Sequence, residues 1–196
     1  KTIKAWRSQV ARINRWLSAT DLTLLDNDVS DAVDEDGLPI APFQRSLRRT
    51  FNNATWQAGG RLSGGFWMSM PRAERFRRIR IGGEGIADVD YQQLYPRLAY
   101  VIVQAEPPTG DIYDVLGDGS RRDGWKVLIN ALLFADGSLG NWPEGTRGSF
   151  PKDLKLREAI RLIEVKHAPI ARLFGTGLGY RLMRHESDIL VSVITH

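Results

Sequence analysis

The chain has 196 residues, a formal net charge of +4 and no cysteine, which excludes a disulfide framework and cysteine-based zinc sites. This length supports one sizeable hydrophobic core, or two small ones, without covalent staples. No window approaches the roughly 18 apolar residues of a membrane span, and the N-terminus lacks a signal pattern. We therefore expect a soluble, cytoplasmic protein without a membrane partner.

The charge is unevenly distributed along the first half of the chain. Residues 21–36 carry acids and no basic residue, whereas residues 43–81 carry arginines against Glu74 alone. These arginines are Arg45, Arg48, Arg49, Arg61, Arg72, Arg75, Arg77, Arg78 and Arg80. Such a dense run indicates a surface for polyanions, because the guanidinium fork suits phosphate. An ordinary solvated surface explains the charge pattern equally well.

Hydrophobic spacing predicts a mainly helical α+β protein with a small antiparallel β element. An N-terminal helix and an acidic linker would occupy residues 1–40, and the main core would occupy residues 41–196. The expected elements are a helix at 2–19, a basic helix at 43–56, a glycine-rich segment at 59–71, strands at 78–81 and 86–91, a helix at 94–104, a short element at 111–116, a helix at 121–135, a loop at 137–151, and helices at 154–166 and 180–194.

Two acids, Asp88 and Asp90, lie on the predicted strand 86–91, which turns directly into a helix. A carboxylate at a strand end is held rigidly, and Mg²⁺ is usually bound by one or two carboxylates together with substrate phosphates. The apolar neighbours of these acids predict burial, where an unpaired acid is costly unless it binds a cation. Solvated acids on an edge strand are the alternative.

The predicted helix 121–135 carries a polar row. Arg122, Lys126 and Asn130 are spaced by four, so they stack along one face of the helix. Two cations and an amide in a row could bind a triphosphate through charge-assisted hydrogen bonds. The exposed face of an ordinary amphipathic helix would have the same pattern.

The glycine-rich segment 59–65 is the third candidate. Its glycines let a backbone approach a ligand closely, and Arg61 could contact a phosphate. Trp56, Phe66 and Trp67 lie near arginines and could stack on bases, although core packing explains them too. Without context the segment is a flexible loop.

These three pieces occur in the order, and at roughly the spacing, that is typical of the family A DNA polymerases. Gly60-Arg61-Leu62-Ser63 resembles the T-G-R-L-S-S segment of that family, and residues 90–97 resemble its motif A, D-Y-S-Q-I-E-L-R. Arg122-x3-Lys126, followed by Phe134, is similar to the fingers helix R-x3-K-x7-Y-G. Residues 179–194 resemble the helix that precedes motif C. The resemblance covers about residues 59–196.

The resemblance implies a right-hand polymerase palm and fingers, with the fingers helix at about 119–136. Asp90 would be the catalytic carboxylate and would bind Mg²⁺ or Mn²⁺ together with the Tyr91 carbonyl. The residues implied for the nucleoside triphosphate are Arg122, Lys126, Asn130, Phe134 and Tyr95. Those implied for the DNA primer–template are Arg61, Arg72, Arg75 and Arg78.

Two departures from the family pattern matter. Tyr95 replaces the glutamate of motif A, and here the chain resembles the family B pattern D-x-x-S-L-Y-P. The second metal carboxylate belongs to motif C, and no such motif is seen before His196. We expect either a truncated core, missing parts or lost chemistry. Glu186 and Asp188 lie in a different element, and Asp188 is expected to be a helix cap or an ion-pair partner.

The expected function is a template-directed nucleotidyltransferase that uses Mg²⁺ and nucleoside triphosphates. The alternative is a non-catalytic nucleic-acid-binding protein on a degenerate or truncated polymerase core. A histidine-based metal hydrolase is disfavoured, because the three histidines have no ligand spacing.

Overall fold

The computed structural model describes residues 3–25, 33–34 and 36–196, so residues 26–32 and 35 of the predicted acidic linker lie outside the described residues. The chain divides into two compact units. The first comprises residues 1–51, 60–90 and 187–196, and the second comprises residues 52–59 and 91–186. Helix α7 (Leu178–Thr195) contributes to both units. This division differs from the one expected at residue 40.

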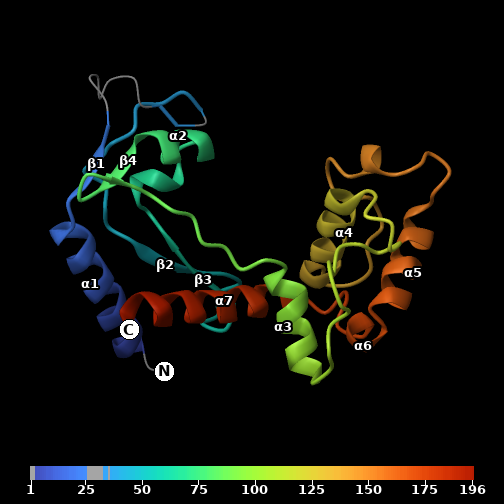
Figure 1. Cartoon of the computed structure of the whole chain (residues 1–196). Helices are drawn as coiled ribbons and strands as arrows, with labels where there is room; N and C mark the ends of the chain where they lie inside the picture. The colour runs from blue at the N-terminus through green and yellow to red at the C-terminus, as the bar shows by residue number, and fades with distance from the viewer. Residues whose placement is uncertain (1–2, 26–32, 35) are drawn as a thin grey trace. The chain divides into compact units, whose positions relative to one another are not determined.

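The first unit contains α1 (Ile3–Ala19), α2 (Arg72–Arg78), a 3₁₀ turn η2 (Phe66–Met68) and two small sheets (Figure 1). One sheet has the strand order β1 (Leu22–Leu24), β4 (Ile79–Ile81) and β5 (Glu84–Gly85), with antiparallel pairing throughout. The other joins β2 (Arg48–Phe51) to β3 (Gly59–Ser63). The fold is therefore α+β with a small antiparallel sheet, as predicted.

Two apolar clusters hold the first unit together. Leu22, Ile40, Phe66, Met70 and Ile79 form one cluster beside the three-stranded sheet. Ile13, Leu62 and Val191 form the other, which joins α1, β3 and the end of α7. Burying a side chain of this size contributes roughly 1.5–3 kcal/mol, so these few residues are the main source of stability for the small sheets.

The predicted helix at 43–56 is wrong, because this segment contains β2 and a turn. Half-buried and exposed residues alternate along β2 with a period of two, which suits a strand and not a helix. Asn53 and Ala54 then adopt positive φ angles of 53° and 50°, which a helix cannot accommodate. The glycine-rich segment that follows, expected as a flexible loop, instead supplies β3.

The predicted strand at 86–91 is also wrong. Gly82 and Gly83 have φ angles of 59° and 82° and turn the chain tightly from β4 into β5, which pairs over only Glu84 and Gly85. Beyond Gly85 the chain leaves the sheet, and Val89 is 91% exposed. The expected burial of the acids in this segment is therefore absent.

The second unit is helical. It contains α3 (Leu94–Val103), α4 (Arg122–Phe134), a 3₁₀ turn η3 (Arg147–Ser149), α5 (Leu156–Lys166), α6 (Ala168–Ala171) and the start of α7. The helices expected at 94–104, 121–135, 154–166 and 180–194 are confirmed to within two residues at each end. The short element expected at 111–116 consists of turns and bends.

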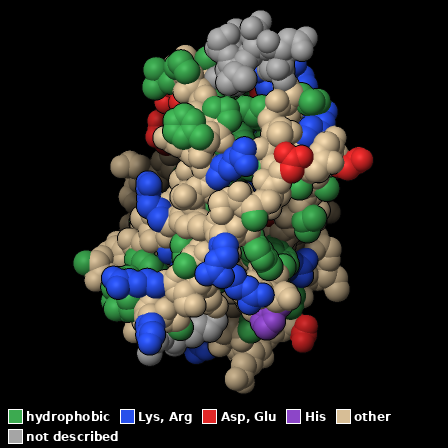
Figure 2. All heavy atoms as spheres, turned by 90° about the vertical axis from the view of Figure 1, so that its left-hand side faces the viewer, with side chains coloured by type: hydrophobic (Ala, Val, Ile, Leu, Met, Phe, Trp, Pro, Cys, Tyr) green, Lys and Arg blue, Asp and Glu red, His purple; other side chains and the backbone are tan. Residues whose placement is uncertain are grey.

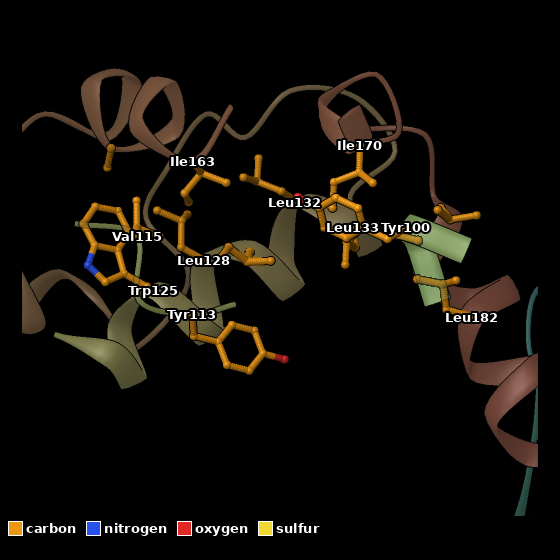
Figure 3. Packing of buried hydrophobic residues seen from close by; sticks show 14 of the residues in the cluster. Tyr100, Tyr113, Val115, Trp125, Leu128, Leu132, Leu133, Ile163, Ile170 and Leu182 are labelled. Carbon is orange, nitrogen blue, oxygen red and sulfur yellow. The ribbon is translucent and has the colours of Figure 1, made fainter. Parts of the chain in front are cut away.

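One core fills the second unit, and α4 is at its centre. Its buried residues recur at helical spacing: Trp125, Leu128, Ile129, Leu132 and Leu133. Figure 3 shows Trp125 and Leu128 near Ile163 of α5, and Leu133 near Tyr100 of α3. The apolar stripe of α4 thus faces the core, and the polar row runs along the edge of this stripe, where Arg122 and Asn130 are half-buried.

A buried polar pair lies within this core. The hydroxyl of Tyr100 and Nδ1 of His167 are 3.0 Å apart, and both side chains are almost completely buried. Burial lowers the pKa of His167 to about 4. His167 therefore has a structural role and is neutral near pH 7.

Candidate functional site

The polar face of α4 gathers four of the predicted nucleotide-binding residues. Arg122, Lys126, Asn130 and Phe134 follow one another at intervals of four residues along the helix, which is just over one turn each. Arg122 and Asn130 are half-buried, whereas Lys126 is exposed. The row therefore runs from a cationic end at Arg122 to an aromatic end at Phe134.

Tyr95, the fifth predicted nucleotide-binding residue, meets the aromatic end of this row. The rings of Tyr95 and Phe134 pack edge to face, with their centroids 5.5 Å apart. Phe134 makes the same kind of contact with Tyr180 at 5.3 Å. A Cβ atom on Gly179 would collide with the Phe134 ring, so the glycine makes room for it. The structure thus brings the motif A-like segment and α4 together at a fixed aromatic cluster.

Glu186 completes this cluster. The hydroxyl of Tyr95 donates a hydrogen bond to Oε2 of Glu186 over 2.8 Å. The two residues are 91 positions apart in the sequence. Neither Tyr180 nor Glu186 was predicted to belong to the site, because no local spacing in the sequence links them to Tyr95.

Arg122, at the cationic end, is held by a carboxylate from the preceding loop. Its Nε donates a hydrogen bond to Oδ2 of Asp111, and its guanidinium lies over the ring of Tyr113, 5.4 Å from the centroid. Oδ1 of Asp111 accepts hydrogen bonds from Nε2 of Gln93 and from the backbone N–H of Tyr113, both at 2.9 Å. Gln93 belongs to the motif A-like segment, so this network is a second link between that segment and α4.

These hydrogen bonds shift the pKa values of Asp111 and Arg122. Desolvation alone would raise the pKa of Asp111, but hydrogen bonds from the Tyr113 backbone and from Arg122 hold it below its ordinary value. The same hydrogen bond raises the pKa of Arg122. Asp111 is therefore ionised at neutral pH, and a phosphate that approaches Arg122 has to share the guanidinium with it.

Lys126 and Asn130, in the middle of the row, make fewer polar contacts than Arg122. Within the described part of the chain, no hydrogen bond or ion pair involves the ammonium of Lys126, and Oδ1 of Asn130 is buried without a hydrogen-bond partner. Lys126 offers donors at the surface, whereas Oδ1 of Asn130 is an acceptor that faces away from solvent. Lys126 is therefore the member of the row best placed to bind an anionic ligand along α4.

Asp90 and Tyr91, the predicted metal-binding residues, are exposed. The neighbouring Asp88 is engaged in an ion pair with Arg72 at 3.1 Å. Over the described ranges, no three His, Asp or Glu side chains cluster as a ready-made metal cage. One carboxylate and one carbonyl fit a Mg²⁺ or Mn²⁺ ion that is held jointly with substrate phosphates, and do not fit a closed protein site.

The predicted nucleic-acid-binding arginines differ in availability. Arg61 is exposed on β3, and Arg72 is 72% exposed on α2. Arg78 is only 11% exposed, and its Nε donates to Glu74 over 2.7 Å. Hydrogen bonds from Arg77 and Arg78 lower the pKa of Glu74 to about 2, so the carboxylate stays ionised. Arg78 is therefore poorly placed to contact a polyanion.

Basic side chains are also spread over the face of the first unit that Figure 2 shows, with few acids among them. Helix α1 contributes Lys4, Arg7, Arg12 and Arg15, and it contains no acid. The exposed arginines of α2 and β3 thus lie in the same unit as a second basic helix, α1.

Asp188 is an ion-pair partner, as predicted. Its carboxylate lies 3.3 Å from Arg49, which is almost completely buried. Arg49 also donates to the carbonyl of Gly60 and to the hydroxyl of Ser187. The contact ties β2, β3 and α7 together, which is a structural role.

Comparisons of the chain with protein families, with curated proteins and with solved structures found no match. Among the helices that the structure describes, none is long and apolar enough to cross a membrane.

Proposed function

We propose that the chain forms the palm and fingers core of a template-directed nucleotidyltransferase that resembles the DNA polymerases. The observation that carries this proposal is the contact between Tyr95 and Phe134. It joins the motif A-like segment to the aromatic end of α4, whose polar face carries Arg122 and Lys126. Two segments that the resemblance implies for nucleotide binding are thereby neighbours.

Each end of the α4 row has a chemical task in this proposal. Arg122 and Lys126 bind the triphosphate through charge-assisted hydrogen bonds. Phosphoryl transfer depends largely on positioning and on stabilising the charge of the transferring group, which fixed cations provide. Tyr95 and Phe134 lie beside the sugar and base, and Asn130 lies between the two ends of the row.

Asp90 and the Tyr91 carbonyl would hold Mg²⁺ or Mn²⁺ together with the substrate. When bound, the metal neutralises phosphate charge and activates the attacking hydroxyl. The exposure of Asp90 supports this role, because a shared metal has to be reached by both the primer and the nucleotide. The DNA primer–template is assigned to Arg61, Arg72 and Arg75.

Primer extension on a DNA template with Mg²⁺ tests this function. We expect incorporation by the unmodified chain and none by Asp90→Ala, with DNA binding largely unchanged in the variant. Glu84→Ala is the matched control, since it removes an exposed acid of the same unit that has no role in the proposal. Near-normal turnover by Asp90→Ala, or no incorporation by the unmodified chain, would count against the proposal.

The exposed basic residues of the first unit favour a second candidate, a non-catalytic nucleic-acid-binding protein on a polymerase-like core. This candidate predicts DNA binding that weakens steeply with salt, because phosphate contacts release counterions. It also predicts no incorporation under any metal condition. Incorporation that depends on Asp90 would eliminate it.

A further inference from the structure

The first unit contains an apolar pocket of about 270 Å³, and Arg75 is the one residue of its lining to which the proposed function gives a role. Its walls come from the end of α1, from β1 and β4, from η2 and α2, and from the segment after β5. The aliphatic part of the wall includes Leu17, Leu22, Ile79 and Ile86. Pockets for drug-sized ligands span roughly 300–1,000 Å³, so this one suits a single ring system.

The wall of this pocket contains a cation, Arg75, and an acid, Asp88, which pairs with Arg72 of α2. The Nε of Arg75 is buried and has no hydrogen-bond partner within the described part of the chain. The other arginines of α2 are paired, since Arg72 lies 3.1 Å from Asp88, and Arg77 and Arg78 share Glu74. A buried Nε without an acceptor is unfavourable, so an acceptor in the pocket, preferably an anion, would stabilise Arg75.

Two aromatic side chains, Trp67 and Phe76, also line the pocket. Trp67 packs edge to face on Phe66 at 5.3 Å, and a Cβ on Gly65 would collide with its indole ring. Gly65 and Phe66 therefore hold the indole in place. Fixed aromatic surfaces next to an arginine are the usual means of binding a base and its phosphate in single-stranded nucleic acid.

We propose that this pocket receives one unpaired base of a nucleic-acid strand, with the adjoining phosphate on Arg75. A free nucleotide has the same chemistry. The strand is favoured because Arg72 and Arg77, on the same helix, are largely exposed and can contact further phosphates. Their surface ion pairs are weak and do not prevent this. The proposal rests on the nucleic-acid-binding part of the proposed function and is independent of catalysis.

Fluorescence of 2-aminopurine, placed in a single-stranded oligonucleotide, tests the proposal, because stacking on an aromatic ring quenches it. We expect the unmodified chain to quench the probe at saturation. Arg75→Gln should weaken binding about tenfold and remove most of the quenching, and Trp67→Leu should remove the quenching. Trp67→Phe keeps a ring and should retain part of it. Circular dichroism verifies that each variant is folded.

Arg77→Gln is the matched control, because it removes one positive charge from α2 without altering the pocket wall. It should lower affinity modestly but leave the quenching at saturation unchanged. Unchanged quenching in folded Arg75→Gln, or no quenching by the unmodified chain, would overturn the proposal. Equal affinity for free 2-aminopurine nucleotide would overturn the assignment to a strand.

Primer extension separates this inference from the proposed function. Incorporation without quenching would support the proposed polymerase activity and contradict the base pocket. Quenching without incorporation would support the base pocket and contradict the polymerase activity.

Discussion

Helices α2 and α4 both carry rows of cations, yet their charges are used differently. On α2, Glu74 neutralises Arg77 and Arg78 within one turn of the same helix. On α4, Arg122 pairs with Asp111 of the preceding loop and, at 3.6 Å, with the exposed Asp123 of its own helix, and Lys126 has no partner among the described residues. Local pairs stabilise a helix surface. A cation without such a partner, such as Lys126, gives up no ion pair when it binds a ligand, whereas Arg77 has to exchange or share Glu74.

The largest effect is expected from Lys126. If α4 binds the triphosphate, Lys126→Ala should lower the rate of nucleotide incorporation by about 100- to 1,000-fold, the usual cost of one donor to a transition-state charge. Arg77→Ala removes a cation from α2 and should change incorporation far less. Steady-state primer extension measures both, and equal losses would remove the distinction between the two helices.

A second prediction concerns the pH dependence of the unfolding free energy, which His167 in the core of the second unit should influence. His167 titrates near 6.5 in the unfolded chain, but its pKa falls to about 4 in the folded state. Its contribution to stability is therefore complete above pH 6.5 and declines as the pH falls towards 4. The total loss is about 3 kcal/mol. Urea unfolding followed by Trp fluorescence at pH 7.5 and pH 5 should detect about 2 kcal/mol of it.

Substitutions separate His167 from other acid effects. His167→Gln should flatten this part of the pH profile, even though it also lowers stability at pH 7.5. His185 is exposed, so His185→Gln should leave the profile unchanged. A profile that is insensitive to His167→Gln would contradict the assignment.

The smallest effect is expected from the ion pairs, Asp111 with Arg122 at α4 and Glu74 with Arg77 on α2, which should differ in strength. Asp111→Asn weakens the hydrogen bond from Arg122 and should cost about 1–2 kcal/mol of unfolding free energy. A double-mutant cycle with Arg122→Gln isolates the coupling between the two side chains. The same cycle on Glu74 and Arg77 should give a smaller coupling, because that pair is solvated. A larger coupling on α2 would reverse the comparison.

Much of the helical structure could be predicted from the sequence. Helices α1, α3, α4, α5 and α7 have strong apolar periodicity, and each begins and ends within two residues of its prediction. Periodicity failed where the elements are short. Strand β2 has only four residues, and its arginine-rich segment also fits a helical pattern. The apolar residues after β5 fit a strand pattern, although no described segment pairs with them.

The sequence alone determined the row of Arg122, Lys126, Asn130 and Phe134, because a helix places every fourth residue on one face. Helical spacing also allows Glu74 to pair with Arg77 and Arg78, which follow it by three and four residues. Only the tertiary structure decided that Glu186 binds Tyr95, that Asp111 holds Arg122, and that Arg75 lines an apolar pocket. The spacing of residues along the sequence predicts which side chains are neighbours within one helix or strand. Contacts between distant segments depend on how the whole core packs, and no short pattern encodes that.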